Sequence, residues 1–186
     1  LTNNSSSSYG NYWGVWSKDA ADANYGASSP TLNYHAWLNH SNAPQSQGYQ
    51  VWSVAPTATS LNIATGHPND SGVTHMMYLF ANCPGVSKFG IYDGLGYGNT
   101  IDINLGFAPR LVMIKDIGTN TTHKWMIFDS FRGITSGNDP YLGFNSYAQD
   151  TSRDLIDPIS DGFRVTNTAI GDINETGSKH LYLAFA

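Results

Sequence analysis

The stretch HMMYLFA at residues 75–81 returns almost unchanged as HLYLAFA at residues 180–186, 105 residues further along the chain. Successive side chains of an extended chain point to opposite faces, and both faces of these two stretches are apolar. A strand that is apolar on both faces is typical of the centre of a sheet covered on both sides. The two stretches therefore predict two central β-strands. In the first of them, the side chains expected to point inward are those of Met76, Tyr78 and Phe80.

Three more pairs of short segments follow one another in the same order in the two halves of the sequence. They are WGVW (13–16) and WMIF (125–128), WLN (37–39) and GFN (143–145), and NDSG (69–72) and NETG (174–177). Four matched blocks in one order indicate an internal duplication of about 105 residues. We predict two tandem, related β-sandwich units, the first over residues 1–83 and the second over residues 84–186.

The first of these units is expected to be incomplete at its N-terminus. The second copy is preceded by GFAPRLVMIKDIG (106–118), which reads as a turn followed by an apolar strand, whereas Leu1 already aligns near Met113. We expect that the chain derives from a longer protein and that at least one strand precedes it. Alternatively, the first copy lacks this strand and is completed by another chain.

The composition and the remaining apolar segments predict an all-β protein. Asn, Ser and Thr together supply 51 residues, Gly supplies 19, and charged residues make up only 12% of the chain. Asn, Ser and Gly favour turns and Thr favours strands, so many short strands joined by turns are expected. Short helical turns are suggested only in residues 18–24 and 147–156. Strands are predicted in TSLNIATG (59–66), RLVMIK (110–115), WMIFDSF (125–131) and DGFRVTN (161–167).

Charge and hydropathy exclude several classes of partner. The net charge is −5 and no basic cluster occurs, whereas nucleic-acid binding requires Lys and Arg to neutralise phosphates. No segment approaches the roughly 18 consecutive apolar residues of a membrane span, so no membrane insertion is expected. A single cysteine, Cys83, excludes an internal disulfide framework.

No catalytic, cofactor or metal site can be recognised from residue spacing. His75 and His180 occupy equivalent positions at the start of the two repeated stretches, and we predict structural roles for both. The other four histidines are isolated in the sequence: His35, His40, His67 and His123. Four aspartates lie close together, but without the alternation of a calcium loop, so turn and cap roles are favoured over calcium binding or glycoside cleavage. They are Asp150, Asp154, Asp157 and Asp161.

Aromatic residues make up 13% of the chain and are expected in two settings. Trp125, Phe128, Phe163 and Phe185 are predicted core residues. Other tyrosines lie among Ser, Asn and Gly, a composition typical of adaptable binding surfaces. These tyrosines are the candidate residues for binding a glycan or a partner, although packing at the sandwich ends or at a subunit interface is the favoured interpretation. They are Tyr9, Tyr12, Tyr25, Tyr97 and Tyr147.

The second half of the chain resembles a known family. It contains, in order, PGVSKFG, GFAPRLVMIK, WMIFDS, DGFRV and YLAFA. This set resembles a repeated β-rich domain of tail-fibre and other virion structural proteins of tailed bacteriophages, above all phages of marine and aquatic bacteria. In that family the copies follow one another head to tail, joined by a passage similar to FANCPGVSKFGIY (80–92). The likeness is looser over residues 13–81, and the turn DGLGYG (93–98) replaces a shorter TGNG turn of the family.

The resemblance implies a virus-particle component with no established chemistry. We expect a non-enzymatic tail-fibre, spike or decoration module at the virion surface, assembled in the bacterial cytoplasm. The expected partners are copies of this chain, with a trimer as the first expectation, other virion proteins and glycans of the host surface. Two alternatives stay open: a polysaccharide depolymerase that uses a pair of acidic residues, and a lectin-like module of a bacterial surface protein.

Overall fold

The computed structural model of the 186-residue chain confirms the all-β class. The structure describes residues 13–25, 34–46, 52–54, 56–64, 69, 71–72, 74–118, 122–144, 153–166 and 171–186. Within this part of the chain, thirteen strands are joined by one helix, α1 (Lys18–Tyr25), and one short 3-10 turn, η2 (Gly171–Ile173). Neither helix is long and apolar enough to cross a membrane.

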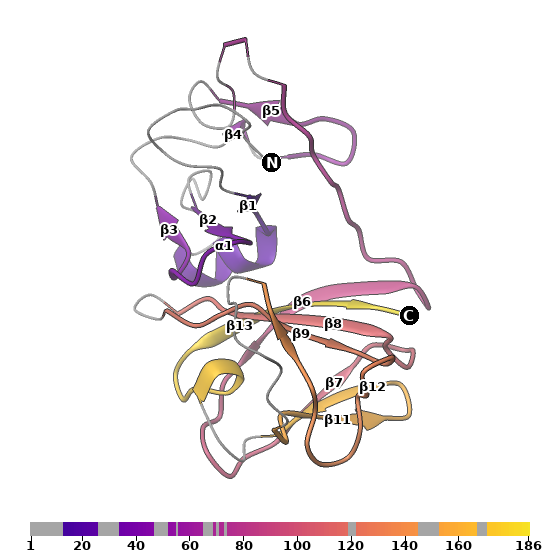
Figure 1. Cartoon of the computed structure of the whole chain (residues 1–186). Coiled ribbons are helices and arrows are strands. Elements are labelled where there is room, and N and C mark those ends of the chain that lie inside the picture. The colour runs from indigo at the N-terminus through magenta and orange to yellow at the C-terminus, as the bar shows by residue number, and fades with distance from the viewer. Residues whose placement is uncertain are drawn as a thin grey trace.

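A five-stranded antiparallel sheet forms the centre of the molecule, with the strand order β10-β9-β8-β13-β6 (Figure 1). The predicted central strand over residues 180–186 is confirmed, because β13 lies between β6 and β8. In the register, Leu183 lies opposite Phe89 of β6 and Met113 of β8. The five strands are β6 (Ser87–Asp93), β8 (Leu111–Asp116), β9 (Met126–Asp129), β10 (Leu142–Gly143) and β13 (Lys179–Phe185).

A second, three-stranded sheet packs on one face of the central sheet and encloses the main hydrophobic core. Its order is β11-β12-β7, and the strands are β7 (Ile101–Asn104), β11 (Ile156–Ile159) and β12 (Gly162–Val165). Phe128 of β9 and Phe163 of β12 are fully buried there, and Tyr182 of β13 lies between the two sheets. Residues 84–186 thus contain the two layers of a β-sandwich.

An N-terminal layer covers the opposite face of the central sheet (Figure 1). Ala20 and Ala21 of α1 are buried against Trp125 and Leu181. The helix begins where Ser17 Oγ accepts a hydrogen bond from the Ala20 amide at 3.4 Å, a typical N-cap contact. Beside the helix lies a small sheet of order β1-β2-β3, made of β1 (Gly14–Val15), β2 (Tyr34–Trp37) and β3 (Gln45–Ser46).

Two side chains of the central region tie the N-terminal layer down. Trp125, which has no exposed surface, donates its Nε1–H to the carbonyl oxygen of Trp37 at 2.9 Å. Lys115 Nζ donates to the carbonyl oxygen of Ser41 at 2.9 Å. A separate hairpin of β4 (Trp52–Val54) and β5 (Asn62–Ile63) lies further from the central sheet (Figure 1).

The strand predicted over residues 75–81 is wrong. Residues 74–82 form no strand, and the side chains of Met76, Tyr78 and Phe80 are 57%, 60% and 61% exposed. The almost identical β13 has a neighbouring strand on each edge, which satisfies its backbone hydrogen-bonding groups. In the described part of the chain, no strand pairs with residues 75–81 in this way. An apolar sequence alone does not make a strand where partners are missing.

The other predicted strands are confirmed, because β5, β9 and β12 lie within the expected segments and β8 extends one residue beyond residues 110–115. The helix suggested over residues 18–24 is confirmed as α1, whereas residues 153–156 are not helical and residues 147–152 lie outside the described residues. The predicted core aromatics Trp125, Phe128 and Phe163 are fully buried. Phe185 is only partly buried and packs edge-on against Phe89, with ring centroids 5.4 Å apart.

Candidate functional site

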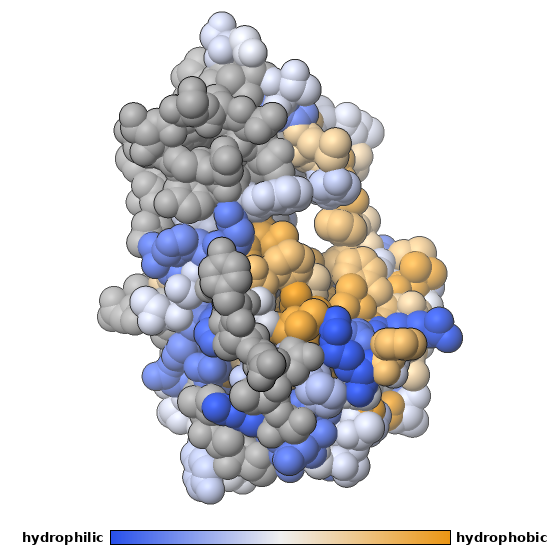
Figure 2. Space-filling model, viewed as in Figure 1, coloured by the Kyte–Doolittle hydropathy of each residue, from blue (hydrophilic) through white to orange (hydrophobic). Residues whose placement is uncertain are grey.

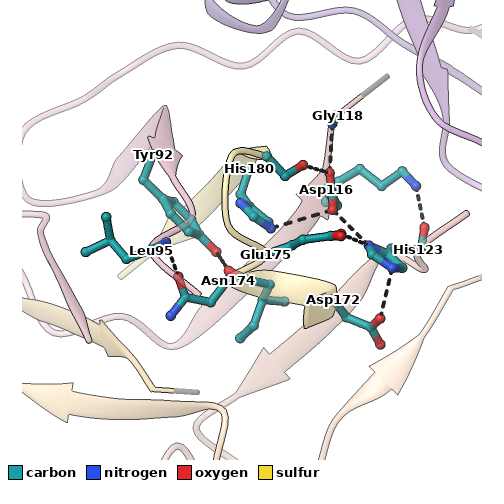
Figure 3. A network of polar contacts seen from close by, with 12 residues as sticks. Tyr92, Leu95, Asp116, Gly118, His123, Asp172, Asn174, Glu175 and His180 are labelled. Atoms are coloured by element: carbon teal, nitrogen blue, oxygen red, sulfur yellow. Dashed lines mark hydrogen bonds and ion pairs between the residues drawn. The ribbon is translucent and has the colours of Figure 1, made fainter. Parts of the chain in front are cut away.

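The most notable polar site of the described chain lies where β8 ends and β13 begins (Figure 3). Asp116 is the last residue of β8, and the antiparallel register places it directly opposite His180. His123 comes from the segment that leads to β9, and Asp172 and Glu175 come from η2 and the turn after it. Four segments of the chain therefore bring three carboxylates and two imidazoles together.

Asp116 is the centre of this polar cluster and has no exposed surface. Its Oδ1 accepts hydrogen bonds from Ser178 Oγ at 2.5 Å and from the Gly118 amide at 2.7 Å. Its Oδ2 lies 2.8 Å from His123 Nδ1 and 3.8 Å from His180 Nε2. Burial alone would raise the pKa of Asp116, but these hydrogen bonds and the two imidazoles outweigh it and hold that pKa below its ordinary value. The carboxylate is therefore ionised at neutral pH.

His123 is surrounded by carboxylates on both ring nitrogens. Nδ1 faces Asp116 and lies 3.8 Å from Oε2 of Glu175, while Nε2 lies 3.4 Å from Oδ1 of Asp172. The backbone is fixed as well, because Lys115 Nζ donates a hydrogen bond to the His123 carbonyl oxygen. Burial lowers the pKa of Lys115 to about 8, and the nearby Asp116 and Asp172 oppose this shift only in part.

A neutral network joins the same cluster to the loop after β6 (Figure 3). The Tyr92 ring stacks on His180, with centroids 5.0 Å apart, and its hydroxyl donates to the Ile173 carbonyl at 2.6 Å. Burial, with a smaller contribution from the Asp116 charge, raises the pKa of Tyr92 well above its ordinary value. Asn174 Oδ1 accepts a hydrogen bond from the Leu95 amide at 2.7 Å. The loop and the turn after η2 are thus held together.

The glycine-rich stretch DGLGYG (93–98) passes close to the backbone of the turn after η2, which leaves no room for a larger side chain at Gly94. A Cβ atom on Gly94 would lie 2.0 Å from the carbonyl oxygen of Glu175. Gly96 has a φ of +82°, in the left-handed region that favours glycine. The stretch is a loop between β6 and β7, as the sequence predicts.

The polar cluster is not arranged for nucleophilic catalysis by serine. Ser178 Oγ donates its hydrogen bond to Asp116, whereas an activated serine requires a base such as His within hydrogen-bond reach. Asp116 Oδ2, His123 Nδ1 and Glu175 Oε2 instead lie within 4.8 Å of one another, which is a spacing that a metal ion can bridge. The arrangement is suited to holding a cation between these three atoms.

The sequence did not identify this cluster. His123 was predicted to be isolated, but the fold places it against Asp116, Asp172 and Glu175. The structural role predicted for His180 agrees with its full burial under Tyr92. Asp116 and His123 are 7 residues apart, but Glu175 follows His123 by 52 residues, so no local spacing could have indicated the whole set. The one available signal was the pairing of the two most apolar strands, which sets Asp116 opposite His180.

Of the five tyrosines predicted to bind a glycan or a partner, the structure describes the side chain of Tyr97 alone. Tyr97 is 79% exposed in the loop after β6. Tyr25 ends α1, but its side chain lies outside the described part of the structure, as do Tyr9, Tyr12 and Tyr147. Recognition by these tyrosines stays a prediction.

The run of aspartates does not converge on one site. Asp154 accepts a hydrogen bond from Thr166 at 2.9 Å, and Asp161 accepts one from Asn104 at 2.7 Å. Asp157 accepts from the Gly137 amide at 3.3 Å, and Asp150 lies outside the described residues. The three described side chains thus bind separate partners, in agreement with the favoured turn and cap roles.

A second feature of functional interest is an exposed apolar strip along the segment that leads into β6. We define the strip as Met76, Tyr78, Leu79, Phe80 and Val86, each more than half exposed. Phe80 lies against the partly buried Phe89 and Phe185, with ring centroids 6.0 and 5.7 Å away. Figure 2 shows hydrophobic residues gathered on this face, between the N-terminal layer and the central sheet.

Comparison with known proteins identifies a family but no activity. Residues 4–186 match a family described as a domain of unknown function, DUF7483. No curated protein and no solved structure matches the chain. The family match spans both the N-terminal layer and the sandwich.

Proposed function

We infer that this chain, which belongs to the DUF7483 domain family, is a non-enzymatic structural or adhesion module at the surface of a tailed-bacteriophage particle. The inference rests on the sequence resemblance over residues 80–186, the β-rich architecture and the low share of charged residues. A tail fibre, a spike and a decoration protein all fit these properties. Such a module acts by binding its neighbours and, at its exposed loops, the host surface.

The observation that carries this proposal is the exposed apolar strip. Soluble monomers rarely expose contiguous apolar surface of this kind, and such patches commonly mark protein–protein contacts. The strip runs into β6, which ends the strand order of the central sheet in the described part of the chain. Cys83 and Ser87 begin an antiparallel bridge at this edge, but the chain then departs from β6. Asn82 Oδ1 accepts a hydrogen bond from the Phe89 amide at 2.7 Å, so the first part of this edge is already occupied and the apolar surface of the strip is the part offered to a neighbour.

We further propose that the chain contains two related units, over residues 1–83 and 84–186, and that residues 75–81 pair in the assembled particle. This segment has nearly the sequence of β13, which is a strand because two partners flank it. A neighbouring copy that supplied such partners would bury Met76, Tyr78 and Phe80 and complete the backbone hydrogen bonds. Pairing at open edges is a common route to assembly.

The test is the mass of the native assembly and its response to substitution. We expect an oligomer, with three copies as the first expectation, and we expect Phe80→Ser to shift it towards the monomer. Phe131→Ser is a matched control, because Phe131 is 99% exposed and lies outside the strip. Native mass spectrometry and light scattering over a range of concentrations give the readout. A protein that stays a 20.2 kDa monomer at high concentration would contradict the proposal, as would equal effects of the two substitutions.

Cys83 allows an independent test of the same interface. It is the only cysteine of the chain, and it is exposed between Phe80 and Val86 of the strip. Copies that meet through the strip would bring two such thiols close together. A short bifunctional maleimide is then expected to cross-link the wild-type chain and to leave Phe80→Ser largely uncross-linked. Cross-linking that does not depend on Phe80 would exclude the strip as the contact.

Glycan recognition is the second part of the proposal, and Tyr97 is its best-placed residue. The side chain is 79% exposed, and its loop is held by Asn99 and Asn174, so the ring is presented on a fixed backbone. Sugars commonly stack on such aromatic rings. We expect Tyr97→Ala to weaken binding to host-cell surfaces or to a glycan array without loss of stability. Unchanged binding by this variant would remove Tyr97 from the recognition surface.

A further inference from the structure

The polar cluster has the donor atoms of a metal centre. Asp116 Oδ2 and Glu175 Oε2 lie 2.8 and 3.8 Å from His123 Nδ1, and the three atoms come from three different segments of the chain. Ligands of a tetrahedral zinc ion at about 2.0–2.2 Å would lie roughly 3.3 Å apart, so the observed spacing brackets the required one. We propose that Asp116, His123 and Glu175 bind a divalent transition-metal ion of the zinc type.

The surroundings of these three residues support the same assignment. A histidine that binds a metal through one nitrogen usually donates its other N–H to a carboxylate or a carbonyl group. His123 Nε2 faces the carboxylate of Asp172 at 3.4 Å, on the opposite side of the ring from the proposed ion. The second oxygen of Asp116 is likewise held, by Ser178 Oγ and the Gly118 amide. Both ligands are therefore oriented by a second layer of contacts.

The negative charges of the cluster favour the binding of a cation. Three carboxylates converge on His123, whereas Lys115 directs its ammonium group to the carbonyl oxygens of Ser41 and His123. Hydrogen bonds and the two imidazoles stabilise the buried Asp116 carboxylate, and a divalent ion would add a positive charge at the centre of the three carboxylates. The imidazole nitrogen favours zinc, cobalt or copper over calcium and magnesium, which prefer oxygen alone.

The ion can enter from solvent. The side chains of Glu175 and His123 are 47% and 25% exposed, whereas Asp116 lies at the closed end of the site. In the ion-free form, His123 Nδ1–H donates a hydrogen bond to Asp116 Oδ2 at 2.8 Å. Metal binding at Nδ1 requires the tautomer that carries its one proton on Nε2, facing Asp172, so the proton moves from Nδ1 to Nε2 through solvent. A water molecule then completes the fourth position, on the exposed side of the site.

The proposal is tested with zinc chloride and cobalt chloride on the whole chain. Isothermal titration should give one Zn²⁺ per chain, and Co²⁺ should give the intense visible absorption of a tetrahedral site. Glu175→Gln keeps the shape of a half-exposed side chain, so this variant should fold while its affinity falls at least tenfold. His123→Gln should abolish the Co²⁺ spectrum. Asp172→Asn should weaken binding by about 10–100-fold, because it removes only the orienting carboxylate.

Two substitutions outside the cluster serve as matched controls. Asp93→Asn removes an exposed carboxylate that pairs with Lys179, and His40→Gln removes a histidine of the N-terminal layer. Both variants should bind Zn²⁺ like the wild type. Absence of Zn²⁺ binding by the wild type would overturn the proposal. So would Zn²⁺ binding that Glu175→Gln and His123→Gln leave unchanged, or binding of Ca²⁺ in preference to Zn²⁺.

Discussion

Trp125 offers the sharpest test of how the N-terminal layer is held on the central sheet. Its ring is fully buried against Leu181 and the alanines of α1, and its Nε1–H reaches the Trp37 carbonyl of β2 at 2.9 Å. Trp125→Phe keeps an aromatic ring in place but removes this donor and part of the ring volume. The substitution therefore affects the junction between the two layers and leaves the core of the sandwich intact.

The expected decrease in the free energy of unfolding has two contributions, the lost hydrogen bond and the lost buried ring volume. Loss of the hydrogen bond to a part-buried carbonyl costs about 1–2 kcal/mol. Loss of about two buried carbon equivalents, at about 0.8 kcal/mol each, adds roughly 1–2 kcal/mol. Trp125→Phe should thus lower the free energy of unfolding by about 2–4 kcal/mol, a large share of the 5–15 kcal/mol typical of a domain.

The measurement combines urea unfolding, followed by far-ultraviolet circular dichroism, with hydrogen–deuterium exchange. We expect faster exchange in α1 (Lys18–Tyr25) under native conditions, because the layer that Trp125 holds opens more often. Phe128→Leu is the matched control, since Phe128 is equally buried but faces the sandwich core. A change below about 0.5 kcal/mol, which is ordinary for a surface substitution, together with unchanged exchange in α1, would refute this role of Trp125.

Three further predictions concern the core, a buried lysine and a close backbone contact. Phe128→Ala should cost about 3–5 kcal/mol in urea unfolding, because it empties a fully buried site. Lys115 has a folded pKa of about 8 against an ordinary value of 10.5, so the unfolded chain binds its proton more tightly. The stability of the wild type relative to Lys115→Met should therefore rise between pH 8 and 10.5 by up to about 1.4 kcal/mol per unit, and a flat difference would contradict this. Gly162→Ala should cost about 3 kcal/mol or more in thermal or urea unfolding, because its Cβ would lie 1.9 Å from the Ile103 carbonyl oxygen, whereas Gly14→Ala has room and should change little.

The strands that the sequence predicts correctly are those whose own apolar residues are sufficient to place them in the core. LVMIK and MIF in β8 and β9 are runs of apolar residues bounded by turn signals, and such runs become strands wherever a core forms. HMMYLFA has the same character but is not a strand, because pairing depends on neighbours that the segment itself does not encode. Helix α1 lies where residues 18–24 suggest it, but the packing of the N-terminal layer on the central sheet was not predicted, because its contacts are made by small residues that carry no strong pattern: Ala20, Ala21 and Ala36.

The polar cluster marks the limit of prediction from local spacing. Asp116 and His180 meet because two strands pair in one register, and that part can be anticipated once both strands are recognised. Asp172 and Glu175 lie in η2 and the turn after it. Nothing in the sequence GDINE (171–175) distinguishes a turn that reaches the polar cluster from one that faces solvent. Metal ligands on separate loops are visible only after the fold has brought them together.

The alternation of side chains along β8 couples this cluster to the N-terminal layer. Lys115 and Asp116 are consecutive, so they point to opposite faces of the central sheet. Lys115 donates a hydrogen bond to the Ser41 carbonyl oxygen of the N-terminal layer, whereas Asp116 faces the polar cluster. Both residues also contact His123: Lys115 binds its carbonyl oxygen, and Asp116 binds its imidazole ring. A ligand that fixes the His123 ring therefore also fixes the carbonyl that anchors Lys115. Because coupling between sites is reciprocal, an ion at the cluster and a firmly seated N-terminal layer should each favour the other. If the exposed strip is the assembly surface, the cluster is placed to stabilise the form of the chain that assembles.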